Sequence, residues 1–119
     1  MNPSAATGPQ PATAPAAALA ITLVSCPPDA AERIARHLVD ARLAACVSVL
    51  PQLRSIYRWQ GAVEQADEAL LLIKHPAAGF EALRAAVLRE HPYELPEIVA
   101  VPVGAVHPPY LDWILASCA

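Results

Sequence analysis

The sequence predicts an α+β fold of the ferredoxin-like type, in which strands and helices follow one another as βαββαβ and an extra helix ends the chain. Three observations predict it. Short apolar runs alternate with two segments of helical periodicity. The stretch Ser55–Lys74 resembles two strands folded back on each other at Gln60-Gly61. The proline pair Pro108-Pro109 opens a final helical segment.

The chain divides into a tail over residues 1–18 and one folded domain over residues 19–119. The tail holds four prolines, seven alanines and no charged residue. This composition offers too little bulky apolar surface to offset the entropy of ordering, so we expect disorder there. The run Ala20–Ser25, which Cys26-Pro27-Pro28 closes, predicts a buried central strand.

A first amphipathic helix is predicted after this strand. Asp29 followed three residues later by Glu32 resembles a capping box, with Asp29 as the N-cap. Apolar residues then recur at helical spacing and form one stripe that should pack on a sheet. The stripe consists of Ala31, Ile34, Ala35 and Leu38.

The hairpin is the longest predicted element. Its first arm runs from about Ala45 to Gln60, with Pro51 as a break, and spans roughly 50 Å at about 3.3 Å per residue. A body of about 100 residues has a diameter of only roughly 30 to 35 Å. Because an overhanging two-stranded ribbon is marginal alone, we expect a homo-oligomer in which hairpins pair across subunits.

The remaining elements complete the second half of the fold. Pro76–His91 predicts a second helix, because Pro92 forbids its continuation. Ile98–Val103 predicts a fourth strand, in which Pro102 requires an edge position or a bulge. The last helix carries Tyr110, Leu111, Trp113 and Ile114.

Composition narrows the class of protein. A length of 119 residues fits one domain, and a net charge of −3 excludes nucleic acid and anionic membrane as expected partners. The stretch Met1–Val24 is too rich in proline and polar residues to span a bilayer and lacks a signal-peptide pattern. We therefore expect a cytoplasmic protein. Three cysteines at no repeating spacing predict thiols rather than disulfides.

Five stretches of the sequence resemble those of CutA, the divalent-cation tolerance family. They are Arg-Leu-Ala-Ala-Cys-Val at 42–47, Ser-Ile-Tyr-Arg-Trp-Gln-Gly at 55–61, Leu-Leu-Ile-Lys at 71–74, His-Pro-Tyr-Glu-Leu-Pro-Glu-Ile at 91–98 and Tyr-Leu-Asp-Trp at 110–113. The resemblance covers most of Ile21–Ala116. It implies a PII-like homotrimer held by strand pairing between subunits, binding of copper or other divalent metal ions, and no catalytic reaction.

The topology suggests one place for a metal ion, although the sequence has no CxxC or HxxxH motif. Strands one and four are antiparallel neighbours in this fold, which brings Cys26 close to Glu90 and His91. A thiolate, a carboxylate and an imidazole suit copper or zinc. The resemblance implies copper ligands here too, but Ser25 stands at the family's cysteine position and Glu90 replaces the first of two histidines. The alternative is that Cys26 is a packed thiol and His91 a helix C-cap.

A second candidate site is a cleft between subunits. An ammonium that ends a buried strand requires a carboxylate or an anionic ligand, so we expect Lys74 to pair with Glu64, Glu68 or Glu94, or to bind an anion. The aromatic residues can line the cleft or pack at the interface. Cys46 is predicted to be a small buried thiol, although the resemblance marks it as part of the inter-subunit region. The predicted cleft residues are Cys46, Tyr57, Trp59, Lys74, Tyr93, Glu94 and Trp113.

Two functions remain open. The first is a homotrimeric divalent-cation tolerance protein that binds copper or another divalent metal ion as its only cofactor. The alternative is a PII-like signalling trimer that binds a small anionic ligand in inter-subunit clefts. An enzyme is disfavoured, because no nucleophile-base pair, glycine-rich phosphate loop or acid pair occurs at a recognisable spacing.

Overall fold

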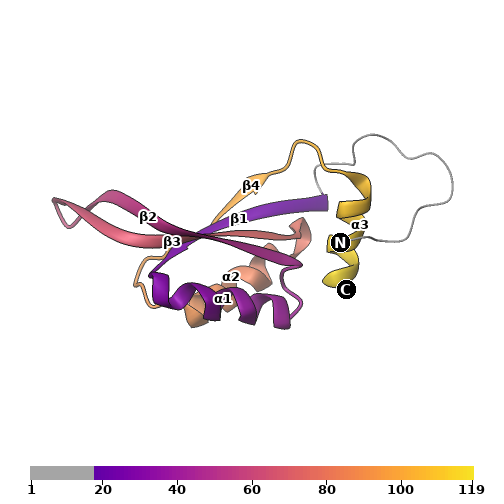
Figure 1. The fold of residues 1–119 in the computed structure, drawn as a ribbon, viewed down its shortest axis with the longest axis horizontal. Coiled ribbons are helices and arrows are strands. Elements are labelled where there is room, and N and C mark those ends of the chain that lie inside the picture. Colours follow the sequence, from indigo (N-terminus) through magenta and orange to yellow (C-terminus); the bar gives the residue numbers. More distant parts are fainter. Residues whose placement is uncertain (1–17) are drawn as a thin grey trace.

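The computed structural model describes residues 18–119 as a βαββαβ fold with a C-terminal helix (Figure 1). Apart from Ala18, the predicted tail lies outside the described residues. The predicted fold class is confirmed. The elements are β1 (Leu19–Cys26), α1 (Pro28–Asp40), β2 (Cys46–Trp59), β3 (Ala62–Pro76), a 3-10 turn (Ala77–Gly79), α2 (Phe80–Glu90), β4 (Val99–Pro102) and α3 (Pro108–Ser117).

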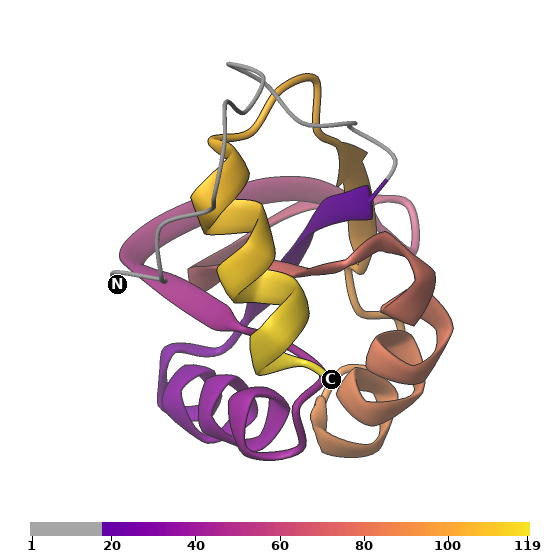
Figure 2. The ribbon, with the colours of Figure 1, turned by 90° about the vertical axis from the view of Figure 1, so that its right-hand side faces the viewer.

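The four strands form one antiparallel sheet in the order β2-β3-β1-β4. β4 is an edge strand, which confirms the position that Pro102 requires. Helices α1 and α2 lie side by side on one face of the sheet, and α3 lies at the end away from the hairpin tip (Figures 1 and 2). On the opposite face α3 packs against Leu19 at that same end, and the rest of this face has no helical cover among residues 18–119.

The core lies between the sheet and helices α1 and α2. The predicted α1 stripe is buried there, together with the inward residues of β1 and β3. Burying a Leu or Ile side chain contributes about 1.5–3 kcal/mol relative to leaving it in water, so this layer dominates stability. Its largest members, each at most 1% exposed, are Ile34, Leu38, Leu71, Ile73 and Leu83.

A second, smaller core joins the two ends of the described chain. Leu19 at the start of β1 packs against Leu111 and Ile114 of α3, and all three side chains are buried. Trp113 and Tyr110 cover this cluster and stack on each other with ring centroids 5.7 Å apart. These contacts hold α3 across the end of the sheet.

Two local predictions were wrong. The N-cap of α1 is Pro27 and no side chain caps the helix, so Asp29 and Glu32 form no capping box. Pro28 occupies the first turn and has no N–H to cap, which moves the helix start ahead of Asp29. α2 begins at Phe80 rather than Pro76, because β3 runs on through Pro76. The same extension places His75 in the strand.

The hairpin extends far beyond the rest of the molecule. Gln60 and Gly61 both have positive φ, at 51° and 82°, as a type I′ turn requires. The protein measures 57 × 26 × 25 Å, and the hairpin occupies one end of the long axis (Figure 1). Ile56 and Val63 near the tip are 69% and 66% exposed. This outer half is a two-stranded ribbon, and no strand within residues 18–119 pairs with either of its edges.

The uncovered face of the sheet is apolar. Register places Ile21 between Lys74 and Val101, and alternation puts all three side chains on the face away from α1 and α2. The next row on this face joins Leu23 with its register partners in β3 and β4, Leu72 and Val99. Val99 and Val101 are 50% and 38% exposed, so the described chain leaves apolar sheet surface in water.

Candidate functional site

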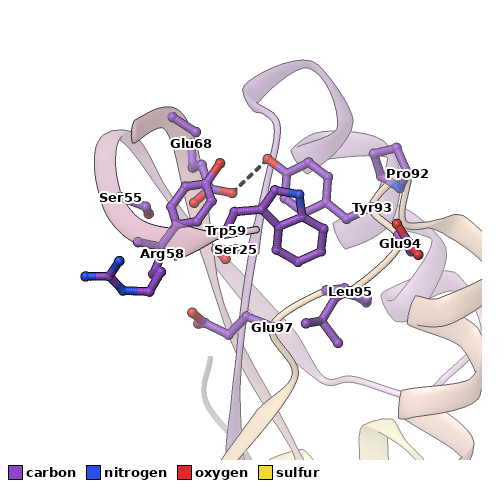
Figure 3. Close-up of a pocket in the computed structure, with 13 residues that line it drawn as sticks. Ser25, Ser55, Arg58, Trp59, Glu68, Pro92, Tyr93, Glu94, Leu95 and Glu97 are labelled. Carbon is purple, nitrogen blue, oxygen red and sulfur yellow. Dashed lines mark hydrogen bonds between the residues drawn. The ribbon is translucent and has the colours of Figure 1, made fainter. Parts of the chain in front are cut away.

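An open groove of about 880 Å³ lies at the base of the overhanging hairpin (Figure 3). One wall is the uncovered face of β2, β3 and the end of β1. The other wall is the segment 92–97, which links α2 to β4. The groove is lined by Ser25, Ser55, Tyr57, Arg58, Trp59, Ala66, Glu68, Pro92, Tyr93, Glu94, Leu95, Pro96 and Glu97.

A β-bulge in β2 decides which side chains face the groove. Leu50 pairs with Leu70 and Leu53 with Glu68, so β2 carries one extra residue in this interval. Gln52 lies in the bulge with φ 60°. One extra residue exchanges the two faces of a strand beyond it. Odd-numbered residues of β2, Tyr57 and Trp59 among them, therefore join the face that carries Glu68.

His91 fixes the segment that forms the other wall. Its Nε2 donates to the backbone carbonyl oxygen of Ser25 at 2.7 Å, and its Nδ1 accepts from the backbone N–H of Tyr93 at 3.1 Å. Because Nδ1 accepts, the ring is the Nε2-protonated neutral form. The rings of His91 and Tyr93 lie 4.7 Å apart. The imidazole thus connects the end of β1 to the start of the groove wall.

Tyr93 and Glu68 join the two walls. The Tyr93 hydroxyl donates to Glu68 Oε2 at 2.8 Å, and Glu68 is only 5% exposed (Figure 3). Burial, reinforced by this bond to a carboxylate, raises the pKa of Tyr93 well above its usual range. The phenol therefore remains protonated and keeps donating to Glu68 throughout the physiological range.

The proposed metal ligands are not gathered into a three-ligand site within this chain. Cys26 is fully buried in the core, and burial, with the nearby Glu68 charge, raises the pKa of its thiol. Glu90 binds Arg33 in an ion pair at 2.5 Å, and both ring nitrogens of His91 have partners. Across residues 18–119 no three His, Cys, Asp or Glu side chains lie close enough to hold a metal ion.

The seven predicted cleft residues fall into two groups at opposite ends of the sheet. Four line the groove: Tyr57, Trp59, Tyr93 and Glu94. The other three, Cys46, Lys74 and Trp113, lie toward α3. Ten residues of β3 separate Lys74 from Glu64, the register partner of Tyr57, which corresponds to roughly 33 Å. A single chain therefore cannot bring the two groups into one site.

Lys74 has no carboxylate partner among the described residues, whose three ion pairs involve other side chains. The expected pairing with Glu64, Glu68 or Glu94 within the chain is wrong. Its ammonium instead donates to Ser48 Oγ at 2.5 Å and lies 4.0 Å from Cys46 Sγ. The thiol of Cys46 is free and partly exposed.

Sequence reasoning missed Glu68 as a groove residue and considered it only as a partner for Lys74. Its position in the sequence could have indicated a role. Glu68 directly precedes the apolar run Ala69–Ile73, and burying a carboxylate costs free energy unless it has a binding partner. Arg58 and Glu97 were missed because only the folded segment 92–97 brings them to the same hollow.

A family model described as "CutA1 divalent ion tolerance protein" matches residues 20–117. The chain is 45% identical over 97 residues to "Protein CutA homolog" of Xenopus laevis, covering 81% of this chain and 64% of that protein. It is 46% identical over 95 residues to "Divalent-cation tolerance protein CutA" of Thermus thermophilus, covering 79% of this chain and 92% of that protein. The chain thus spans less than two thirds of the Xenopus relative.

Solved structures agree with the sequence relatives. The crystal structure of CutA from Xylella fastidiosa superposes with a TM-score of 0.83 at 43% identity, covering 85% of this chain and 98% of that one. A structure described as "PII-like protein CutA" from Nostoc has a TM-score of 0.79 at 37% identity, covering 84% of this chain and 97% of that one.

The cytoplasmic location remains a prediction, because the names of two relatives refer to the chloroplast and to the periplasm. In the structure of residues 18–119, no helix is both long and apolar enough to cross a bilayer.

Proposed function

Because this chain belongs to the CutA1 divalent ion tolerance family, we propose that it is a homotrimeric, non-enzymatic protein that binds copper or another divalent cation and acts in metal tolerance. One observation carries the proposal of assembly. The hairpin of β2 and β3 projects beyond the rest of the described domain, and no part of residues 18–119 covers its outer edges or the apolar sheet face around Val99 and Val101.

The energetics of the uncovered face favour assembly. A two-stranded ribbon in water is marginally stable, and exposed strand edges pair readily with other chains. Burying apolar surface contributes roughly 25 cal/mol per Å², so covering Val99 and Val101 on this face, and Ile56 on the other side of the overhanging hairpin, stabilises a closed oligomer.

Light scattering coupled to size exclusion tests the assembly. We expect a mass near three times 12.6 kDa at micromolar concentration. Ile56→Lys places a charge on the overhang without touching the core, and should weaken assembly. Val39→Lys, on the exposed side of α1, is the matched control and should leave the mass unchanged. A monomeric wild type would refute the trimer.

For copper, we propose Cys26, Glu90 and His91 as the ligands, which requires the segment after α2 to move. The raised pKa of the buried Cys26 thiol means that binding must displace a proton, so affinity should be weak near pH 7 and should rise with pH. His91 must release Ser25 or Tyr93. In calorimetry, Cys26→Ser and His91→Ala should each weaken copper binding at least tenfold. Unchanged affinity in both would discard these ligands.

A second candidate function rests on Lys74. Its partly buried ammonium faces the uncovered sheet face and donates to Ser48, with no carboxylate within ion-pair distance among residues 18–119. Such a cation in an inter-subunit cleft would bind a small anionic ligand. A thermal-shift screen separates the two functions, because stabilisation grows with ligand occupancy. Stabilisation by copper alone supports the first, and stabilisation by an anionic metabolite that Lys74→Met abolishes supports the second.

A further inference from the structure

We propose that the groove between β2, β3 and the segment 92–97 binds an organic ammonium ion with a small apolar body. This proposal goes beyond metal binding and does not depend on it. Three features of the groove carry the inference, namely a buried carboxylate, aromatic walls and an excess of negative charge.

The buried carboxylate is Glu68. Glu68 is only 5% exposed, and it forms no ion pair with any cation among residues 18–119. One oxygen, Oε2, accepts from Tyr93. Within the described residues every fully buried side-chain oxygen has a partner, so Oε1, which has none, remains open to the groove. A hydrogen bond from a cationic donor would stabilise the negative charge of such a strongly desolvated carboxylate.

The aromatic walls suit a cation that carries carbon. Tyr57, Trp59 and Tyr93 all line the groove, and they remain 43%, 38% and 38% exposed. The faces of such rings attract ammonium groups, most strongly for Trp, and also contact an apolar body. Figure 3 shows Trp59 and Tyr93 on the same hollow as Glu68. The volume of about 880 Å³ falls within the range of small-molecule sites.

The charge of the lining selects against anions. Glu68, Glu94 and Glu97 contribute three negative charges, and Arg58 contributes one positive charge, so the lining carries a net charge of −2. The guanidinium of Arg58 points away from Trp59 and Tyr93 (Figure 3). A bare metal ion fits less well, because no three ligating side chains converge among residues 18–119 and aromatic rings supply no ligand atoms.

Three probes of one shape test the charge that the groove prefers. Benzylamine is a cation at pH 7, benzyl alcohol is neutral, and benzoate is an anion. Calorimetry on the assembled full chain should give an affinity for benzylamine at least about tenfold higher than for benzyl alcohol, with benzoate weaker than both. In NMR spectra, benzylamine should shift the indole N–H signal of Trp59 and leave that of Trp113, at the other end of the sheet, in place.

Variants test which groove residues cause the preference for the cationic probe. Glu68→Gln should reduce the selectivity for benzylamine over benzyl alcohol to less than about threefold, and Trp59→Leu should weaken benzylamine at least about fivefold. Glu81→Gln on the exposed side of α2 is the control and should change neither affinity. If Glu68→Gln fails to fold, Trp59→Leu and the three probes on the wild type still decide.

Several outcomes would overturn the proposal. They are equal affinity for the cation and the neutral probe, no binding of benzylamine at millimolar concentration, or selectivity that survives in Glu68→Gln. None of these results bears on the mass of the assembly or on copper affinity, so the proposed function stands or falls separately.

Discussion

The Nε2 of His91 donates a 2.7 Å hydrogen bond to the backbone carbonyl oxygen of Ser25, and this bond joins the C-terminal cap of α2 to the end of β1. The same ring accepts the backbone N–H of Tyr93. His91 thereby sets the position of the segment that closes the groove, whether or not it ever meets a metal ion.

His91→Ala should lower the free energy of unfolding by about 1–3 kcal/mol, because the carbonyl of Ser25 and the N–H of Tyr93 lose their partners. Urea unfolding at one fixed protein concentration measures the change. His107→Ala is the matched control, since His107 is exposed at the start of α3, and should change stability by less than about 0.5 kcal/mol. Equal losses in the two variants would contradict a structural role for His91.

Tyr93→Phe should cost about 1–3 kcal/mol, because Glu68 would lose its hydrogen-bond donor while it stays 5% exposed. Urea unfolding at pH 7 provides the measurement. Tyr57→Phe removes a hydroxyl from the same groove at an exposed position and should be nearly neutral. If Tyr93→Phe were also neutral, the bond across the groove would carry no stability.

His75 should make stability depend on pH. The residue is fully buried, with its Nδ1 bonded to the Pro76 carbonyl oxygen and its Nε2 to the Thr22 hydroxyl, and burial lowers its pKa below the ordinary value of 6.5. Below about pH 6.5 the unfolded chain then binds a proton that the folded chain does not. Stability is therefore complete above pH 6.5 and falls as pH decreases, by at most about 1.4 kcal/mol per pH unit.

Unfolding curves of the wild type and His75→Gln between pH 7.5 and 5.5 test this dependence. The difference between the two proteins should narrow as pH falls, because only the wild type loses the contribution of a neutral imidazole. The partly exposed His37 of α1, replaced by Gln, serves as the control and should leave the slope of the wild type intact. A constant difference across this pH range would show that His75 titrates alike in both states.

Deletion of Gln52 should remove the bulge without turning the outer half of β2 over. With the extra residue gone, Pro51 alone lies between Leu50 and Leu53, so Leu53 still pairs with Glu68 and Trp59 keeps its place on the groove face. In a Trp113→Phe background, acrylamide quenching of Trp59 should therefore stay at the level of the parent protein.

Gln52→Gly keeps the residue count and suits the φ of 60°, so it is the matched control for the deletion. Quenching should stay unchanged in this variant, and stability should rise by up to about 1 kcal/mol. Clearly higher quenching in the deletion variant than in Gln52→Gly would mean that the outer half of β2 had changed face, which would contradict this pairing.

The elements of the fold were predictable because their signals are local. Alternation and the Gln60-Gly61 pair specified the hairpin, and the spacing of Ile34 and Leu38 specified the buried side of α1. The start of α1 was not predictable in this way, because Asp29 is a favoured N-cap residue and Pro28 is favoured in the first turn. The helix begins at Pro28.

The groove was only half predictable. Tyr57, Trp59, Tyr93 and Glu94 were expected in one cleft, and they share one hollow. Pro51 indicated a break in β2 but not how many residues the bulge inserts, so the face of Tyr57 could not be assigned. Lys74 and Trp113 lie far from the groove because β3 is long. The predicted cleft residues were chosen without regard to this distance within one chain.

The contact of Leu19 with Ile114 places both ends of the described domain beside each other, at the pole opposite the hairpin tip. A short linker between them would give a circular permutant whose new termini can be cut into an exposed connection such as that between α1 and β2. An affinity tag or dye fused after α3, at the C-terminal end, sits far from the groove along a 57 Å axis. Surface immobilisation through that end would leave the groove facing the solution.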